Sequence, residues 1–100
     1  TFGGTLGTRN NAPVVDIPGV QMRFRAADDK QAPTRGRILD HIGFDVSDHA
    51  AFVQKIQAEG ITLDEPVRTG SSGNILTYIT DPWGTRIEII ERAPLGPQVR

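Results

Sequence analysis

The chain has 100 residues, 37% of them hydrophobic and 23% charged, which is ordinary for one globular domain or part of a larger fold. The formal net charge of −1 gives no reason to expect nucleic acid or an anionic membrane as partner, and no apolar run approaches the roughly 20 residues of a membrane span. The absence of cysteine excludes disulfides, thiolate metal ligands and cysteine nucleophiles, and it is consistent with a reducing, cytoplasmic location.

Residues 1–26 are predicted to contain strands only. Residues 5–10 and 13–17 have the composition of short strands separated by a turn signal. Apolar and polar residues then alternate over residues 20–25, which predicts a third strand. The Gly3-Gly4 pair resembles the exit from a helix, so we expect a strand and a helix upstream that this chain lacks. This region is therefore predicted to be the remnant of a βαβββ module.

Residues 27–37 are polar, contain proline and glycine, and are predicted to form a linker. Residues 38–92 then show the order β-α-β-β-β, which is one complete module. Its expected elements are a strand at 38–46, a helix at 48–59, a weak edge strand at 61–69 interrupted by Pro66, strands at 74–80 and 85–91, and a disordered or loosely docked tail at 93–100.

The carboxylate of Glu88 lies between two isoleucines of the last predicted strand. The single predicted helix can cover only one face of the sheet. Strand alternation puts Glu88 on the opposite face, which it shares with His41 of the module's first strand. On the covered face we expect apolar packing among Phe52, Val53 and Ile56 of the helix and Ile42, Phe44, Ile87 and Ile89 of the strands.

His41 and Glu88 form a candidate metal-binding pair. If the first and last strands of the module are neighbours, the imidazole and the carboxylate can reach a common divalent ion, for which Zn, Fe, Mn, Ni and Co are all suitable. The alternative is that both are ordinary solvated side chains on a polar sheet face, because two ligands alone make an incomplete site.

The stretch "LDHIGFDVSDHAAFVQKIQAEGI", followed by "YITDPWGTRIEIIE", resembles the second module of the vicinal oxygen chelate superfamily. That group includes glyoxalase I, extradiol dioxygenases, bleomycin- and fosfomycin-resistance proteins and methylmalonyl-CoA epimerase. The resemblance implies an α+β fold of two paired βαβββ modules, here with an incomplete first module. In that fold a cupped mixed sheet surrounds a divalent metal and the helices lie outside. It also implies that His41 and Glu88 are metal ligands and that Glu88 takes part in catalysis.

Three further residues bear on this expectation. Arg23 stands in the first module at the position that Glu88 has in the second, and its guanidinium cannot bind a metal. This suits a site of two histidines and one glutamate if an upstream strand supplies the second histidine. Arg23 would hold an anionic or enolate oxygen of the substrate, or else it is a solvated charge or a partner for a nearby carboxylate. The hydroxyl of Tyr78 either touches the substrate or caps the sheet. His49, at the start of the helix, is expected on the surface.

The resemblance implies a metal-dependent enzyme, of lyase, isomerase or dioxygenase type, that acts on a small molecule with vicinal oxygens. Whether the chain is active as it stands is left open. The alternatives are a metal-free protein that binds a small molecule, as bleomycin-resistance proteins do, and an inactive fragment. Because the incomplete first module leaves sheet edges unpaired, we also expect a homodimer.

Overall fold

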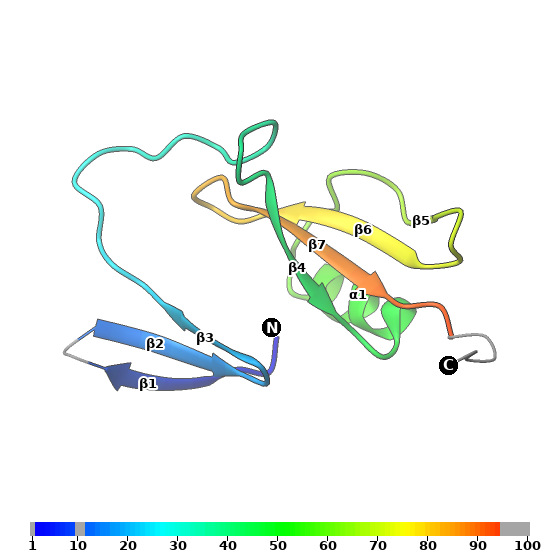
Figure 1. The fold of residues 1–100 in the computed structure, drawn as a ribbon, viewed down its shortest axis with the longest axis horizontal. Coiled ribbons are helices and arrows are strands. Elements are labelled where there is room, and N and C mark those ends of the chain that lie inside the picture. The colour runs from blue at the N-terminus through cyan, green and yellow to red at the C-terminus, as the bar shows by residue number, and fades with distance from the viewer. Residues whose placement is uncertain (1, 10–11, 95–100) are drawn as a thin grey trace, which may run out of the picture. The chain divides into compact units, whose positions relative to one another are not determined.

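The computed structural model describes residues 2–9 and 12–94, so residues 95–100 of the tail predicted at 93–100 lie outside the described residues. The chain divides into two compact units, Thr1–Lys30 and Gln31–Arg100. Each unit has its own sheet, and the second also contains a helix, which gives the mixed α+β architecture expected from the sequence (Figure 1).

The first unit is an antiparallel sheet of three strands in the order β1-β2-β3. Strand β1 spans Thr5–Arg9, β2 spans Ala12–Ile17 and β3 spans Val20–Arg23. A tight turn joins β2 to β3, and its Gly19 adopts a φ of 91°, which residues with a side chain rarely adopt. The strands agree with the alternation in the sequence, and no helix occurs among the described residues of this unit.

The second unit is a four-stranded mixed sheet in the order β4-β7-β6-β5. Strands β4 and β7 are parallel, whereas β6 pairs antiparallel with both β7 and β5. Together with α1, these strands follow the chain order β-α-β-β-β. Their bounds are His41–Asp45 for β4, His49–Ala58 for α1, Arg68–Thr69 for β5, Ile75–Thr80 for β6 and Arg86–Glu91 for β7.

Two predicted strands are shorter than expected. The strand predicted at 38–46 begins only at His41, because the chain forms a turn at Thr34–Arg37 and the side chains of Ile38 and Leu39 are exposed. The strand predicted at 61–69 is reduced to the two residues of β5, as expected for a segment that contains Pro66.

Helix α1 begins and ends as its sequence predicts. The Asp48 side chain accepts a hydrogen bond from the backbone N–H of Ala51 over 3.0 Å, which caps the first turn. At the other end Gly60 has a φ of 86°, and the N–H of Ile61 bonds back to the carbonyl of Ile56. No helix in the described ranges is long and apolar enough to cross a membrane.

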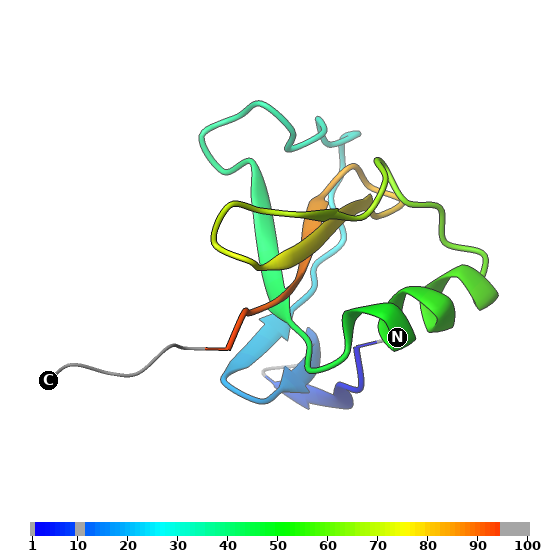
Figure 2. The same cartoon turned by 90° about the vertical axis from the view of Figure 1, so that its right-hand side faces the viewer.

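Helix α1 covers one face of the sheet and packs against β7 (Figure 2). Val53 and Ile56 are buried there, with Ile87 and Ile89 also buried on β7, as predicted. Phe52, which was predicted to be buried, is only half-buried, because the buried stripe of the helix runs through positions 49, 53 and 56.

His49 lies on that buried stripe, so the expectation of a surface histidine is wrong. Its side chain is 1% exposed, and its Nε2 lies 3.2 Å from the carbonyl oxygen of Ile89, to which it donates. The backbone N–H of His49 also donates to a carboxylate oxygen of Glu91 over 2.8 Å. His49 therefore fastens the first turn of the helix to β7.

Candidate metal site on the open face of the second sheet

The face of the second sheet opposite to α1 carries both predicted metal ligands. In the parallel pairing of β4 with β7, His41 is opposite Arg86 and Gly43 is opposite Glu88. Glu88 is therefore a diagonal neighbour of His41, and Nε2 of His41 lies 3.9 Å from Oε2 of Glu88. The side chains of His41 and Glu88 are 36% and 18% exposed, so both are partly open to solvent.

The imidazole of His41 is held from two sides. Its Nδ1 lies 2.9 Å from Oδ1 of Asp40. Its ring meets the ring of Tyr78 edge-on, with centroids 5.4 Å apart and an interplanar angle of 83°. The pKa of Asp40 is lowered from 3.8, first by the hydrogen bond from the backbone N–H of Gly36 and then by the hydrogen bond with His41. Asp40 is therefore an ionised acceptor at neutral pH.

Tyr78 holds Glu88 in place. The turn between β6 and β7 is fixed by the Asp81 side chain, which accepts hydrogen bonds from the N–H groups of Trp83 and Thr85. This turn sets the register in which Tyr78 lies directly opposite Glu88. The phenol donates to Oε2 of Glu88 over 2.8 Å, and burial together with this hydrogen bond raises the pKa of Tyr78 above 10.0.

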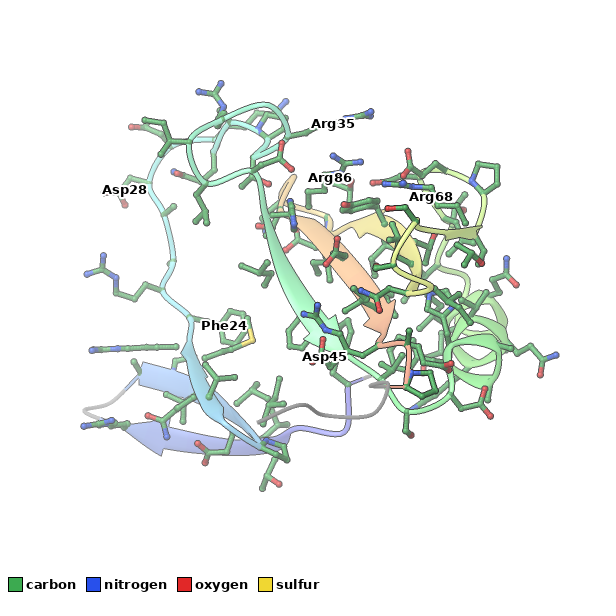
Figure 3. The ribbon with its side chains drawn as sticks, turned by 45° about the vertical axis from the view of Figure 1, so that its right-hand side comes forward. Phe24, Asp28, Arg35, Asp45, Arg68 and Arg86 are labelled. Carbon is green, nitrogen blue, oxygen red and sulfur yellow. The ribbon has the colours of Figure 1, made fainter. Side chains whose placement is uncertain are left out.

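Arg86 completes the site and was missed by the sequence analysis. Its side chain extends from the start of β7 (Figure 3). Its guanidinium lies 3.9 Å from the centroid of the Tyr78 ring, and its Nη1 lies 3.5 Å from Oδ1 of Asp40. The available signal was its position two residues before Glu88, which puts it on the same face of the strand. Its Nε is buried and has no hydrogen-bond partner among the described residues.

The five side chains form a closed ring of contacts, which we call the open-face cluster. Its members, in the order of contact, are Arg86, Asp40, His41, Glu88 and Tyr78, with Tyr78 returning to Arg86. Asp40 and Glu88 contribute two carboxylates and Arg86 one cation. With a neutral imidazole, the cluster has a net negative charge that favours a cation.

The geometry fits an ion held by His41 and Glu88. Ligand atoms lie about 2.0–2.2 Å from a Zn-type ion, so two of them on one tetrahedral ion are about 3.5 Å apart. The observed 3.9 Å between Nε2 and Oε2 needs only a small side-chain rotation to meet this value. Within the part of the chain that the structure describes, no group of three or more His, Cys, Asp or Glu residues could hold a metal. If an ion binds here, the described residues would supply two of its ligands, and further ligands would have to come from elsewhere.

Arg23, the remaining predicted site residue, lies at the end of β3 in the first unit. Its side chain is exposed, and its backbone is paired with that of Val14 on β2. Its suggested role toward the substrate stays a prediction.

A family model described as the Glyoxalase/Bleomycin resistance protein/Dioxygenase superfamily matches residues 9–89. The chain belongs to this superfamily. The match covers most of both units, and it confirms the resemblance drawn from the sequence motifs.

Several solved structures share the fold. A glyoxalase family protein from Bacillus anthracis has a TM-score of 0.74 at 19% identity, covering 93% of this chain and 76% of its own. A genomically encoded fosfomycin resistance protein from Listeria monocytogenes has a TM-score of 0.71 at 18% identity, covering 92% and 75%. A virulence protein from Salmonella typhimurium has a TM-score of 0.63 at 23% identity, covering 91% and 79%. No curated protein sequence gives a significant match.

Proposed function

We propose that this protein is a metal-dependent enzyme of the superfamily, of lyase, isomerase or dioxygenase type, acting on a small molecule with vicinal oxygens. His41 and Glu88 would supply two ligands to a divalent Zn, Fe, Mn, Ni or Co ion. The observation that supports this most strongly is the 3.9 Å approach of His41 Nε2 to Glu88 Oε2 on the face that α1 leaves uncovered. Such an ion supplies Lewis acidity toward substrate oxygens.

The other members of the cluster have roles that follow from their contacts. Tyr78 orients the Glu88 carboxylate through its hydrogen bond, and its aromatic edge restrains the His41 ring. Arg86 carries a positive charge 3.5 Å from Oδ1 of Asp40 and offsets part of the negative charge of the cluster when no ion is bound. Arg23 is proposed to hold an anionic or enolate oxygen of the substrate.

Metal binding by purified protein tests this function. The metal-free protein is titrated with Zn²⁺, Ni²⁺, Co²⁺ and Mn²⁺ by calorimetry, alongside His41→Ala, Glu88→Gln and the double variant. We expect at least a tenfold loss of affinity for each single substitution. Glu59→Gln is the matched control, because Glu59 is the C-terminal capping residue of α1, the helix that covers the other face of the sheet. Equal metal content in the wild type and the double variant would place the ion elsewhere.

A metal-free binding protein is the second candidate, and one observation favours it. Leu76, Tyr78 and Ile90 form a buried apolar cluster on the same face as Glu88, next to the candidate ligands. Apolar residues around the partly exposed His41 and Glu88 suit the apolar part of a small molecule bound without an ion. Thermal stabilisation by candidate ligands in the presence of a chelator, without turnover, would support this function. If neither a metal nor a ligand changes the thermal stability, the result would support the third alternative, a chain without activity of its own.

The proposed assembly is a homodimer in the cytoplasm. Support for the dimer comes from β4, which lies at the end of the described sheet order and leaves one edge of its backbone without a strand partner there. Light scattering at micromolar concentration should give twice the mass of the chain. A folded monomer under those conditions would contradict the proposal.

A further inference from the structure

The carboxylate of Asp40 is surrounded by hydrogen-bond donors. Its Oδ2 accepts from the backbone N–H of Gly36 over 2.5 Å, and its Oδ1 lies 3.5 Å from Nη1 of Arg86. The first of these contacts depends on a turn in which the N–H of Arg37 bonds to the carbonyl of Thr34 over 3.0 Å. Gly36 has a φ of 78° in this turn, a value that suits glycine and brings its N–H toward Asp40.

These donors decide the direction of the hydrogen bond between Asp40 and His41. A carboxylate only accepts hydrogen bonds, so Nδ1 of His41 must carry the hydrogen in the 2.9 Å contact. A neutral imidazole with its hydrogen on Nδ1 has a free lone pair on Nε2. That nitrogen is the one that lies 3.9 Å from Glu88.

We propose that Asp40 is a positioning residue, which fixes the Nδ1–H tautomer of His41 and so presents the Nε2 lone pair on the side of Glu88. The role of this lone pair in binding an ion rests on the proposed function. The tautomer itself does not, because it is set by contacts within the metal-free chain. Metal-binding histidines commonly have a carboxylate on their second nitrogen, and removing such a partner typically lowers metal affinity about 10–100-fold.

The tautomer can be measured directly in metal-free protein. Long-range ¹H–¹⁵N correlation spectra, recorded over a pH series until the ring signals stop shifting, distinguish the protonated nitrogen of the neutral ring from the unprotonated one. We expect Nδ1 of His41 to carry the hydrogen in the wild type. Asp40→Ala should shift the population to the Nε2–H form, whereas Asp40→Asn should retain the wild-type form because its amide oxygen can still accept.

A matched control and a second measurement make the test decisive. Asp45→Ala removes an aspartate from the other end of β4, where Asp45 pairs with Arg92, and it should leave the His41 tautomer unchanged. Zn²⁺ affinity should fall at least tenfold in Asp40→Ala and less in Asp40→Asn. A wild-type His41 with its hydrogen on Nε2, or a tautomer that does not respond to Asp40→Ala, overturns the proposal.

The proposed metal function and the positioning role of Asp40 can be disproved independently of each other. If wild-type protein shows the Nδ1–H tautomer and loses it in Asp40→Ala, yet Zn²⁺ affinity is the same in the wild type and in His41→Ala, then Asp40 positions the ring as inferred. In that case the error lies in the assignment of His41 as a metal ligand. If His41→Ala loses Zn²⁺ while Asp40→Ala keeps it, the metal function holds and the positioning role of Asp40 is wrong.

Discussion

Tyr78 and Glu88 lie directly opposite each other on β6 and β7, and the phenol donates to the same carboxylate oxygen, Oε2, that faces His41. One oxygen therefore serves both contacts. Because the chain contains a single tyrosine, any phenol signal measured in this protein comes from Tyr78.

The raised pKa of Tyr78 predicts a loss of stability at alkaline pH. Below pH 10.0 the phenol is protonated in both the folded and the unfolded states, so its contribution to stability is fully present. As the pH rises above 10.0, the unfolded state loses its proton first, and the free energy of unfolding of metal-free protein falls until the pH passes the folded pKa. Urea unfolding at a series of pH values should show this decline. The Tyr78→Phe variant should lack this part of the decline. Equal slopes of the free energy of unfolding against pH in the two proteins would contradict the prediction.

Gly43 provides room beside Glu88. A Cβ atom added at Gly43 would lie 3.5 Å from Oε1 of Glu88, which is an ordinary van der Waals contact. We therefore expect Gly43→Ala to keep wild-type metal affinity, whereas Gly43→Leu should displace the carboxylate and lower affinity at least tenfold. Calorimetric titration with Zn²⁺ measures both. Urea unfolding is the control, because the residue at this position is exposed and neither change should cost more than about 1 kcal/mol.

The core between α1 and β7 should be sensitive to truncation. Ile56 is fully buried, so Ile56→Ala is expected to lower the free energy of unfolding by about 3 kcal/mol through lost apolar burial and a cavity. Ile38→Ala is the matched control, because Ile38 is fully exposed and should change stability by less than about 0.5 kcal/mol. Similar losses in the two variants would mean that α1 does not cover the sheet as described.

The two histidines should behave in opposite ways. His49→Ala leaves a cavity and removes the partner of the Ile89 carbonyl, so we expect a loss of about 2 kcal/mol in stability with no change in metal affinity. His41→Ala should lower metal affinity and change stability by less than about 1 kcal/mol, since His41 is partly exposed. Urea unfolding and Zn²⁺ titration of both variants check this contrast, and an exchange of the two outcomes would refute it.

Alternation and helix periodicity predicted much of the second unit. The face of Glu88 followed from the period of two along its strand, and the bounds of α1 followed from a good cap at Asp48 and a glycine at position 60. These features are local, so a single sequence contains enough information to place them.

Two expectations of the sequence analysis were wrong for different reasons. His49 was expected on the surface because it begins a helix on the outer side of the sheet, but it is four residues before Val53 and seven before Ile56, which puts it on the buried stripe. Ile38 and Leu39 are apolar and suggested a longer strand, although only pairing with β7 decides where β4 begins. The contacts of Asp40 with Arg86 could not be predicted, because they depend on how two strands far apart in sequence are aligned.

The central position of β7 has a consequence for how the protein is made. This strand is the last of the sheet in chain order, yet it lies between β4 and β6. During synthesis β4 and α1 leave the ribosome well before β7, so His41 has no Glu88 beside it until β7 emerges. The candidate metal pair can therefore be completed only after β7 has been synthesised, and a ribosome that stops before β7 releases a chain that has the histidine but no carboxylate beside it.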